Sequence, residues 1–282
     1  MGKVGFMQGR LSEIIDGKIQ AFPWQFWQEE FKQAKEIAIP LMEWTLDQRD
    51  LYENPFMTVE GQKKIIQLSK ENELKIPSLT GDCFMQAPFW KASPERREKL
   101  IADLNAILCA CNSLHINTIV IPIVDNSAIT SLKEENYLID VLTDHESVFA
   151  TNGVRVAFES DFPPAKLERF INKMNPIFFG INYDIGNSAS LGFNVDDEFI
   201  SYGHRILNVH VKDRILGGTT VPLGFGDADF ESVFSNLFKC GYSGNYILQT
   251  ARDPAGKHSQ VINDYLNKTC KWIADYESKS FR

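Results

Sequence analysis

The 282-residue sequence has no apolar run approaching the roughly 20 residues that a membrane-spanning helix needs. Its first residues, MGKVGFMQGR, also lack the apolar core of a signal peptide. The basic residues form no run and the formal net charge is −8, whereas nucleic-acid affinity depends on clustered Lys and Arg. We therefore expect a protein with no membrane partner and no nucleic-acid partner.

Cysteine is scarce, and its five copies are odd in number and scattered along the chain. Cys109 and Cys111 fall inside a helical pattern, so the spacing indicates neither a disulfide framework nor a zinc knuckle. This usage suits a reducing compartment, and we expect the protein to be cytoplasmic.

The sequence also lacks a Pro/Gly/Ser linker, a low-complexity tract or a break in composition. Short apolar runs alternate with longer amphipathic ones, which predicts a single (β/α)8 TIM barrel over residues 1–282. The expected strands are 4–8, 39–44, 74–79, 117–124, 154–159, 179–184, 206–212 and 245–250. The expected helices are 24–38, 58–72, 94–114, 134–150, 165–174, 196–201, 230–239 and 260–277.

Polar side chains end four consecutive strands in the second half of the chain: Glu159, Asp184, His210 and Gln249. The carboxyl ends of parallel strands meet at one mouth of a barrel, where active sites of this fold lie. Taken singly, each carboxylate could be an ion pair or a loop cap, and the histidine a hydrogen-bonded core residue. Together, the four side chains predict one metal site.

The motifs MEW, AFES, NYDIGN, HVKDR and LGFGDADF, in this order and spacing, resemble the xylose-isomerase-like barrels of the sugar phosphate isomerase/epimerase group. The resemblance implies one divalent ion (Mn, Mg, Co or Zn) held by Glu159, Asp184 and His210. It also implies a fourth ligand at Gln249, where the family usually has a second Glu. A glutamine can still offer a carbonyl oxygen to a hard ion.

The chemistry that the resemblance implies is proton transfer beside a metal-polarised carbonyl of a small sugar, sugar phosphate or related compound. Glu159 and the residue at position 249 would be its catalytic groups. Because the amide of Gln249 cannot transfer a proton as a carboxylate does, we favour a one-base isomerase over a two-base epimerase. The alternative is a non-catalytic carbohydrate-binding or regulatory barrel. An apurinic endonuclease would need a histidine-rich zinc cluster and a basic face, and the sequence has neither.

Other residues near the strand ends are candidates for binding substrate. Glu43 ends the second strand, Asn187 follows Asp184, and Lys212 and Arg214 follow the histidine. Glu43 could equally be an ion pair at the barrel mouth, and Asn187 a helix cap.

Two long loops and one glycine-containing loop should form the pocket wall. Trp24 in loop 9–27 and Phe89 in loop 81–94 are candidate substrate contacts, although such rings could instead pack on helices or form the contact of a homo-oligomer. The glycine-containing segment 217–230 could cradle a phosphate through backbone N–H groups, although it matches no nucleotide-binding spacing. Whether the substrate carries a phosphate stays open at this stage.

Overall fold

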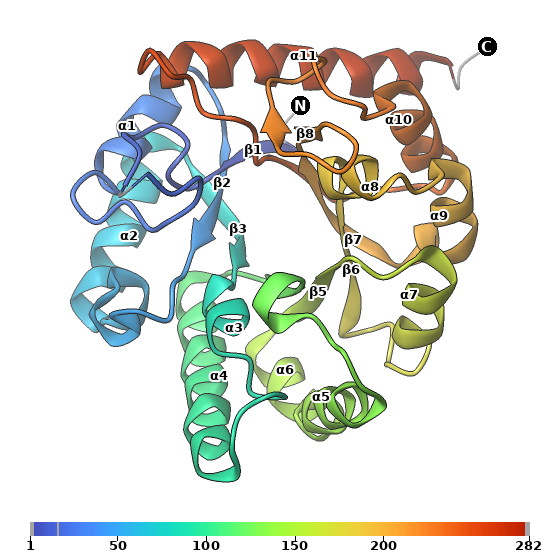
Figure 1. The fold of residues 1–282 in the computed structure, drawn as a ribbon. Coiled ribbons are helices and arrows are strands. Elements are labelled where there is room, and N and C mark those ends of the chain that lie inside the picture. The colour runs from blue at the N-terminus through green and yellow to red at the C-terminus, as the bar shows by residue number, and fades with distance from the viewer. Residues whose placement is uncertain (1–2, 16, 280–282) are drawn as a thin grey trace.

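A computed structural model describes residues 3–15 and 17–279. Eight parallel strands close into a barrel in the order β1-β10-β7-β6-β5-β4-β3-β2 (Figure 1). The strands are β1 (Val4–Met7), β2 (Leu41–Thr45), β3 (Lys75–Thr80), β4 (Thr118–Ile123), β5 (Arg155–Ser160), β6 (Phe179–Asp184), β7 (Ile206–Val211) and β10 (Asn245–Leu248). The predicted barrel is confirmed.

Helices surround the barrel in chain order, so that the colours of Figure 1 run once around the molecule. They are α1 (Glu29–Glu36), α2 (Val59–Asn72), α3 (Asp82–Gln86), α4 (Pro94–Leu114), α5 (Leu132–Asp144), α6 (Glu146–Asn152), α7 (Pro164–Ile171), α8 (Ile185–Leu191), α9 (Val195–Tyr202), α10 (Phe230–Lys239) and α11 (His258–Lys279). No helix among the described residues is long and apolar enough to span a membrane.

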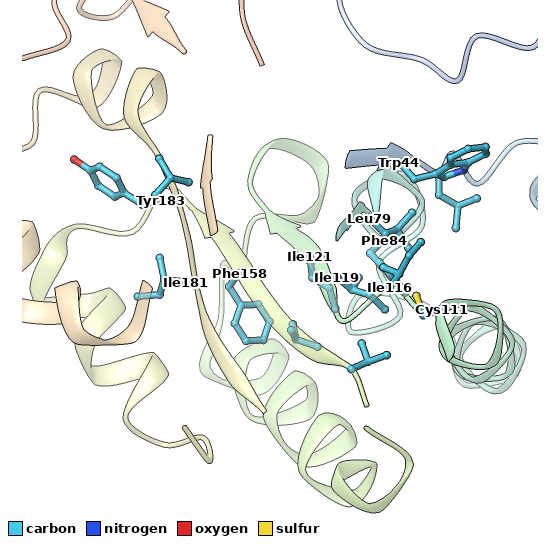
Figure 2. Packing of buried hydrophobic residues seen from close by; sticks show 14 of the residues in the cluster. Trp44, Leu79, Phe84, Cys111, Ile116, Ile119, Ile121, Phe158, Ile181 and Tyr183 are labelled. Atoms are coloured by element: carbon cyan, nitrogen blue, oxygen red, sulfur yellow. The ribbon is translucent and has the colours of Figure 1, made fainter. Parts of the chain in front are cut away.

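The apolar core lies between the strands and the helices. Phe158 on β5 meets Phe170 of α7 edge-on, with ring centroids 5.2 Å apart, and Phe149 of α6 meets Phe179 of β6 at 5.5 Å. Figure 2 shows part of this layer, including Phe158. Because successive strand residues face opposite sides, an outward Phe158 puts Glu159 toward the barrel interior.

The aromatic residues of the first long loop also belong to the core. Phe22 is buried and lies 5.4 Å from the Trp44 ring and 4.9 Å from Trp24. Trp27 meets Trp44 at 5.8 Å. Residues 24–28, expected to begin a helix, instead form turns that seat these rings, and α1 begins at Glu29.

Further elements differ from the sequence prediction. The helix expected over 134–150 is two helices, because α5 ends at Asp144 and is followed by His145, whose ring Nδ1 bonds the Val141 carbonyl at 2.7 Å. The short helices α3 and α8 follow β3 and β6 directly, within segments expected to be loops.

The loop after β7 is organised around one buried carboxylate, Asp213. It opens with a small hairpin of β8 (Asp213–Arg214) and β9 (Thr220–Val221). The Asp213 side chain accepts bonds from the backbone N–H groups of Gly224 (2.7 Å), Gly226 (2.9 Å) and Ala228 (3.2 Å). A Cβ at position 226 would collide with this carboxylate, so glycine is required there.

Glu135 ties α5 to the α7 region by three charge-assisted bonds, two from Arg169 (2.6 and 2.7 Å) and one from Lys173 (2.7 Å). The bonds from Arg169 chiefly, with those from Lys173, lower the pKa of Glu135 below its ordinary 4.5 against the opposing effect of burial. Because the pKa of Glu135 is lower in the folded state, its ionised carboxylate stabilises the fold at pH values above the ordinary 4.5. This stabilisation is lost as the pH falls through the lowered pKa.

We therefore expect Glu135→Gln to lower the free energy of unfolding by about 1–3 kcal/mol at neutral pH, since it weakens charged hydrogen bonds to a buried group. The deficit should shrink as pH falls below 4.5. Urea unfolding at a series of pH values measures it, with Asp140→Asn at an exposed position of α5 as the matched control. A deficit that is the same at every pH would contradict the ion-pair explanation.

Candidate functional site

The four polar strand ends predicted from the sequence lie together at the carboxyl end of the barrel. Glu159, Asp184 and His210 are buried, and one potential ligand atom from each lies within 4.8 Å of the others. Gln249, just after β10, joins them through Lys212, whose Nζ is 2.8 Å from Gln249 Oε1 and 2.6 Å from Asp184 Oδ2. Gly186 in α8 leaves room for Lys212, because a Cβ there would be 2.7 Å from its Cγ.

His210 is the centre of the cluster and is fully buried. Its Nδ1 is 3.0 Å from Glu159 Oε2 and 3.9 Å from Asp184 Oδ2, whereas its Nε2 is 2.7 Å from Glu43 Oε1. Burial alone would lower the pKa of His210, but the charge of Glu43 and the bond to Glu159 outweigh it and raise the pKa to about 10. The Nδ1 edge of the ring therefore faces Glu159 and Asp184, and the Nε2 edge is held by Glu43.

Glu43 provides that anchor from inside the barrel. It is fully buried, and its Oε2 accepts bonds from Ser78 Oγ at 2.6 Å and Asn208 Nδ2 at 2.9 Å. Glu43 is not one of the described residues that line the cavity above the cluster. Its contacts suit a group that orients the histidine rather than one that touches substrate.

Asn182 orients the opposite edge of the histidine. Its Oδ1 accepts a bond from Asn208 Nδ2 at 2.9 Å, which directs its own Nδ2 to donate to Glu159 Oε2 at 3.0 Å, with His210 Nδ1 also 3.0 Å away. The alternation of side chains along β6 and β7 places Asn182 and Asn208 on the inward face of the barrel. Only the structure shows which groups they bond.

The two carboxylates of the cluster have different electrostatic environments. Burial would raise the pKa of Glu159, but the hydrogen bond from His210 and the charge of Lys212 outweigh it and lower the pKa to about 2. For Asp184, burial and the charge of Glu159 raise the pKa in spite of Lys212. Asp184 Oδ1 also accepts the Asn187 N–H at 2.8 Å, which caps α8.

The donor set fits a divalent cation. Two carboxylates and an imidazole nitrogen are common ligands of such ions, and the Nε2 contact with Glu43 is the outer partner that a metal-binding histidine usually has. Asp184 Oδ2 is buried and makes no well-oriented hydrogen bond among the described residues, and its partner is the Lys212 ammonium 2.6 Å away. An ion at this point would replace Lys212 as the partner of that oxygen.

A cavity of about 440 Å³ lies over the cluster, a size that suits a small ligand. Its polar lining includes Gln20, Asp82, Asp125, Glu159, Asp161, Asn187, Lys212, Arg214 and Gln249.

The predicted substrate contacts divide into two groups. Asn187, Lys212 and Arg214 line the cavity, with Asn187 Nδ2 2.9 Å from Glu159 Oε1. Trp24 and Phe89 are not among its described lining residues: Trp24 packs on Phe22, and Phe89 is fully buried.

Several lining residues were not predicted, among them three aspartates and Gln20. Asp82, Asp125 and Asp161 follow the ends of β3, β4 and β5, so the strand-end rule that finds Glu159 and Asp184 would also have found them. Gln20 has no such signal: it reaches the cavity from the first long loop and bonds Asp82 Oδ2 at 2.7 Å. Burial raises the pKa of Asp82 to about 7.

Known proteins share the sequence pattern and the fold of this chain. Residues 31–275 match the family model described as xylose isomerase-like TIM barrel. The L-ribulose-5-phosphate 3-epimerase UlaE of Salmonella paratyphi C (strain RKS4594) is 25% identical over 255 residues, which cover 82% of this chain and 86% of UlaE.

Two solved structures share the fold. A xylose isomerase domain protein from Planctomyces limnophilus has a TM-score of 0.76 at 16% identity, covering 98% of this chain and 99% of that one. The IolI protein with a bound zinc atom also has a TM-score of 0.76 at 16% identity, covering 97% and 99%. With the family model matching most of the sequence, the chain belongs to the xylose isomerase-like TIM barrel family.

Proposed function

We propose that this protein is a metal-dependent isomerase or epimerase of a small sugar or related hydroxy-carbonyl compound, with isomerisation as the favoured reaction. The observation that carries the proposal is the buried group of Glu159, Asp184 and His210 beneath a polar cavity in a chain of this family. The relatives named as sugar epimerases and the zinc atom in IolI support the same reaction class and cofactor class.

Glu159, Asp184 and His210 would hold the ion, through Nδ1 of the histidine. Gln249 would complete the set through Oε1 once Lys212 moves from it. Manganese, magnesium, cobalt and zinc all suit this mixed oxygen and nitrogen set. When bound, the ion would polarise a carbonyl or hydroxyl oxygen of the substrate.

Glu159 is the residue best placed to move the proton. Its Oε2 faces His210, while its Oε1 lies beside Asn187 at the cavity. Its low pKa keeps it ionised at neutral pH, so it can accept a proton from the carbon next to the substrate carbonyl. Returning that proton to the neighbouring carbon on the same face, while the hydroxyl proton passes to the former carbonyl oxygen, completes an aldose–ketose isomerisation.

Gln249 decides between the two reactions. A two-base epimerisation needs a proton donor on the opposite face, and an amide does not serve as one. Gln249 also has its carbonyl oxygen engaged by Lys212, 2.8 Å away. The same contact supports the alternative of a non-catalytic sugar-binding barrel, in which Lys212 and Gln249 only shape the pocket.

Purified without chelator, the wild-type chain should contain about one divalent ion, as expected for a single set of carboxylate and imidazole ligands. Asp184→Asn and His210→Gln should each lose it, because both remove a ligand. Metal analysis by mass spectrometry, with circular dichroism to check folding, measures this, and Asp140→Asn should retain the ion. A wild-type chain that neither contains an ion nor takes up manganese or zinc would contradict the proposal.

Glu43→Gln should weaken metal binding by about 10- to 100-fold, because it removes the carboxylate that orients the histidine ring. Calorimetric titration with manganese measures the change. Ser78→Ala is the matched control: it deletes another partner of Glu43 but leaves the histidine contact, so its effect should be smaller. Equal affinities for wild type and Glu43→Gln would contradict the orienting role.

With a ketose in deuterated water, the metal-loaded wild type should incorporate deuterium next to the carbonyl, and Glu159→Gln should be slower by at least about 100-fold, since it removes the base. Proton NMR of a ketose panel measures the exchange. Gln249→Glu separates the alternatives: a large gain in a chain that is otherwise inert would favour the non-catalytic barrel over the isomerase.

A further inference from the structure

The loops after the last two barrel strands are where phosphate sites of this fold are often built from backbone N–H groups. In this chain, the first of these loops supplies those groups to itself. Asp213 accepts the N–H groups of Gly224, Gly226 and Ala228, and it is fully buried. An internal carboxylate therefore takes the bonds that a bound phosphate would need, so the glycine-containing segment is not available as a phosphate cradle.

Two other loops are arranged in the same way. After β10, Asp253 Oδ2 accepts the N–H groups of Ala255 (3.1 Å) and Lys257 (2.7 Å). In the loop after β1, buried Glu30 accepts those of Gly9 (2.9 Å) and Leu11 (3.0 Å). Each carboxylate supplies the negative charge that these backbone groups attract.

The cationic side chains at the cavity also have internal partners. Among its described lining residues, the cations are Lys212 and Arg214. Lys212 contacts Asp184 and Gln249, while the guanidinium of Arg214 bonds the Gly218 carbonyl at 2.7 Å and Asn187 Oδ1 at 2.9 Å. Phosphate recognition usually relies on Arg or Lys groups whose donors are free to face the ligand.

The remaining wall of the cavity is acidic. Asp125 and Asp161 line it in addition to Glu159, and Asp82 adds a carboxyl group whose pKa burial raises to about 7. A phosphate monoester carries about −1.5 to −2 charges at neutral pH, so the ionised carboxylates of this wall would repel it. Hydroxyl groups of an uncharged sugar can instead donate hydrogen bonds to the same carboxylates.

From these three observations we infer that the cavity takes an uncharged ketose or related hydroxy-carbonyl compound and discriminates against phosphorylated sugars. The inference rests on the proposed function and narrows its substrate class. It sets this chain apart from its relatives named L-ribulose-5-phosphate 3-epimerase, although they match most of its length.

The test compares pairs that differ only in the phosphate: L-ribulose with L-ribulose 5-phosphate, and D-tagatose with D-tagatose 6-phosphate. Binding to the manganese-loaded protein is measured by calorimetry, with free manganese held constant because phosphates chelate it. In each pair, the unphosphorylated sugar should bind at least about tenfold more tightly, since unpaired like charges at an interface are strongly unfavourable. Asp125→Asn combined with Asp161→Asn should narrow that ratio, whereas Asp140→Asn should leave it unchanged.

The outcomes separate this inference from the proposed function. Equal or tighter binding of the phosphorylated sugars would overturn the inference, and deuterium exchange with those sugars alone would overturn it while leaving the isomerase proposal standing. Preferential binding of an unphosphorylated sugar without exchange would support the inference and contradict the isomerase. Failure of every sugar to bind would overturn both.

Discussion

The histidine between two buried carboxylates is the interaction on which the rest of the site depends. His210 and Glu43 are fully buried, and Glu159 nearly so, at a depth where an isolated charge would be very costly. Each of the three is tolerable only because the others are present and because Ser78, Asn182 and Asn208 supply further hydrogen bonds. The barrel therefore holds its reactive groups as one network rather than as separate side chains.

This network leaves one edge of the histidine facing outward. Its Nε2 is bound to Glu43, so the Nδ1 edge, the nearby oxygen of Asp184 and the carboxylate of Glu159 point to a common place below the cavity. The ammonium of Lys212 lies 2.6 Å from Asp184 Oδ2, so an internal cation is next to that place. With a glutamine at position 249 in place of the usual glutamate, a divalent ion would meet fewer negative charges here and would also compete with an ammonium group. In the proposed metal site, affinity would thus depend strongly on how the remaining ligands are oriented.

The sequence predicts the barrel and the positions of Glu159, Asp184, His210 and Gln249 well, because strand periodicity and strand ends are local patterns. It does not predict the partner of the histidine, since Glu43 lies 167 residues away on another strand and meets it only when the barrel closes. The aromatic residues of the first loop are ambiguous for a related reason. Trp24 packs on Phe22, which packs on Trp44, and nothing local distinguishes a ring that covers the core from one that lines a pocket. The helices α3 and α8 are too short to give a recognisable helical pattern of apolar residues in the sequence.

The same carboxylates that fold the loops also limit what the cavity can accept. Asp213 and Glu30 satisfy backbone N–H groups that would otherwise be left unpaired, so their negative charge is part of the loop structure. Adding a lysine at the cavity would not by itself create a phosphate site, because the N–H groups would still be occupied. Removing Asp213 would free them, but it would also remove what holds the loop in shape. Selectivity against phosphate is therefore linked to the stability of the loops themselves, and a change of substrate class would require the loop after β7 to be rebuilt.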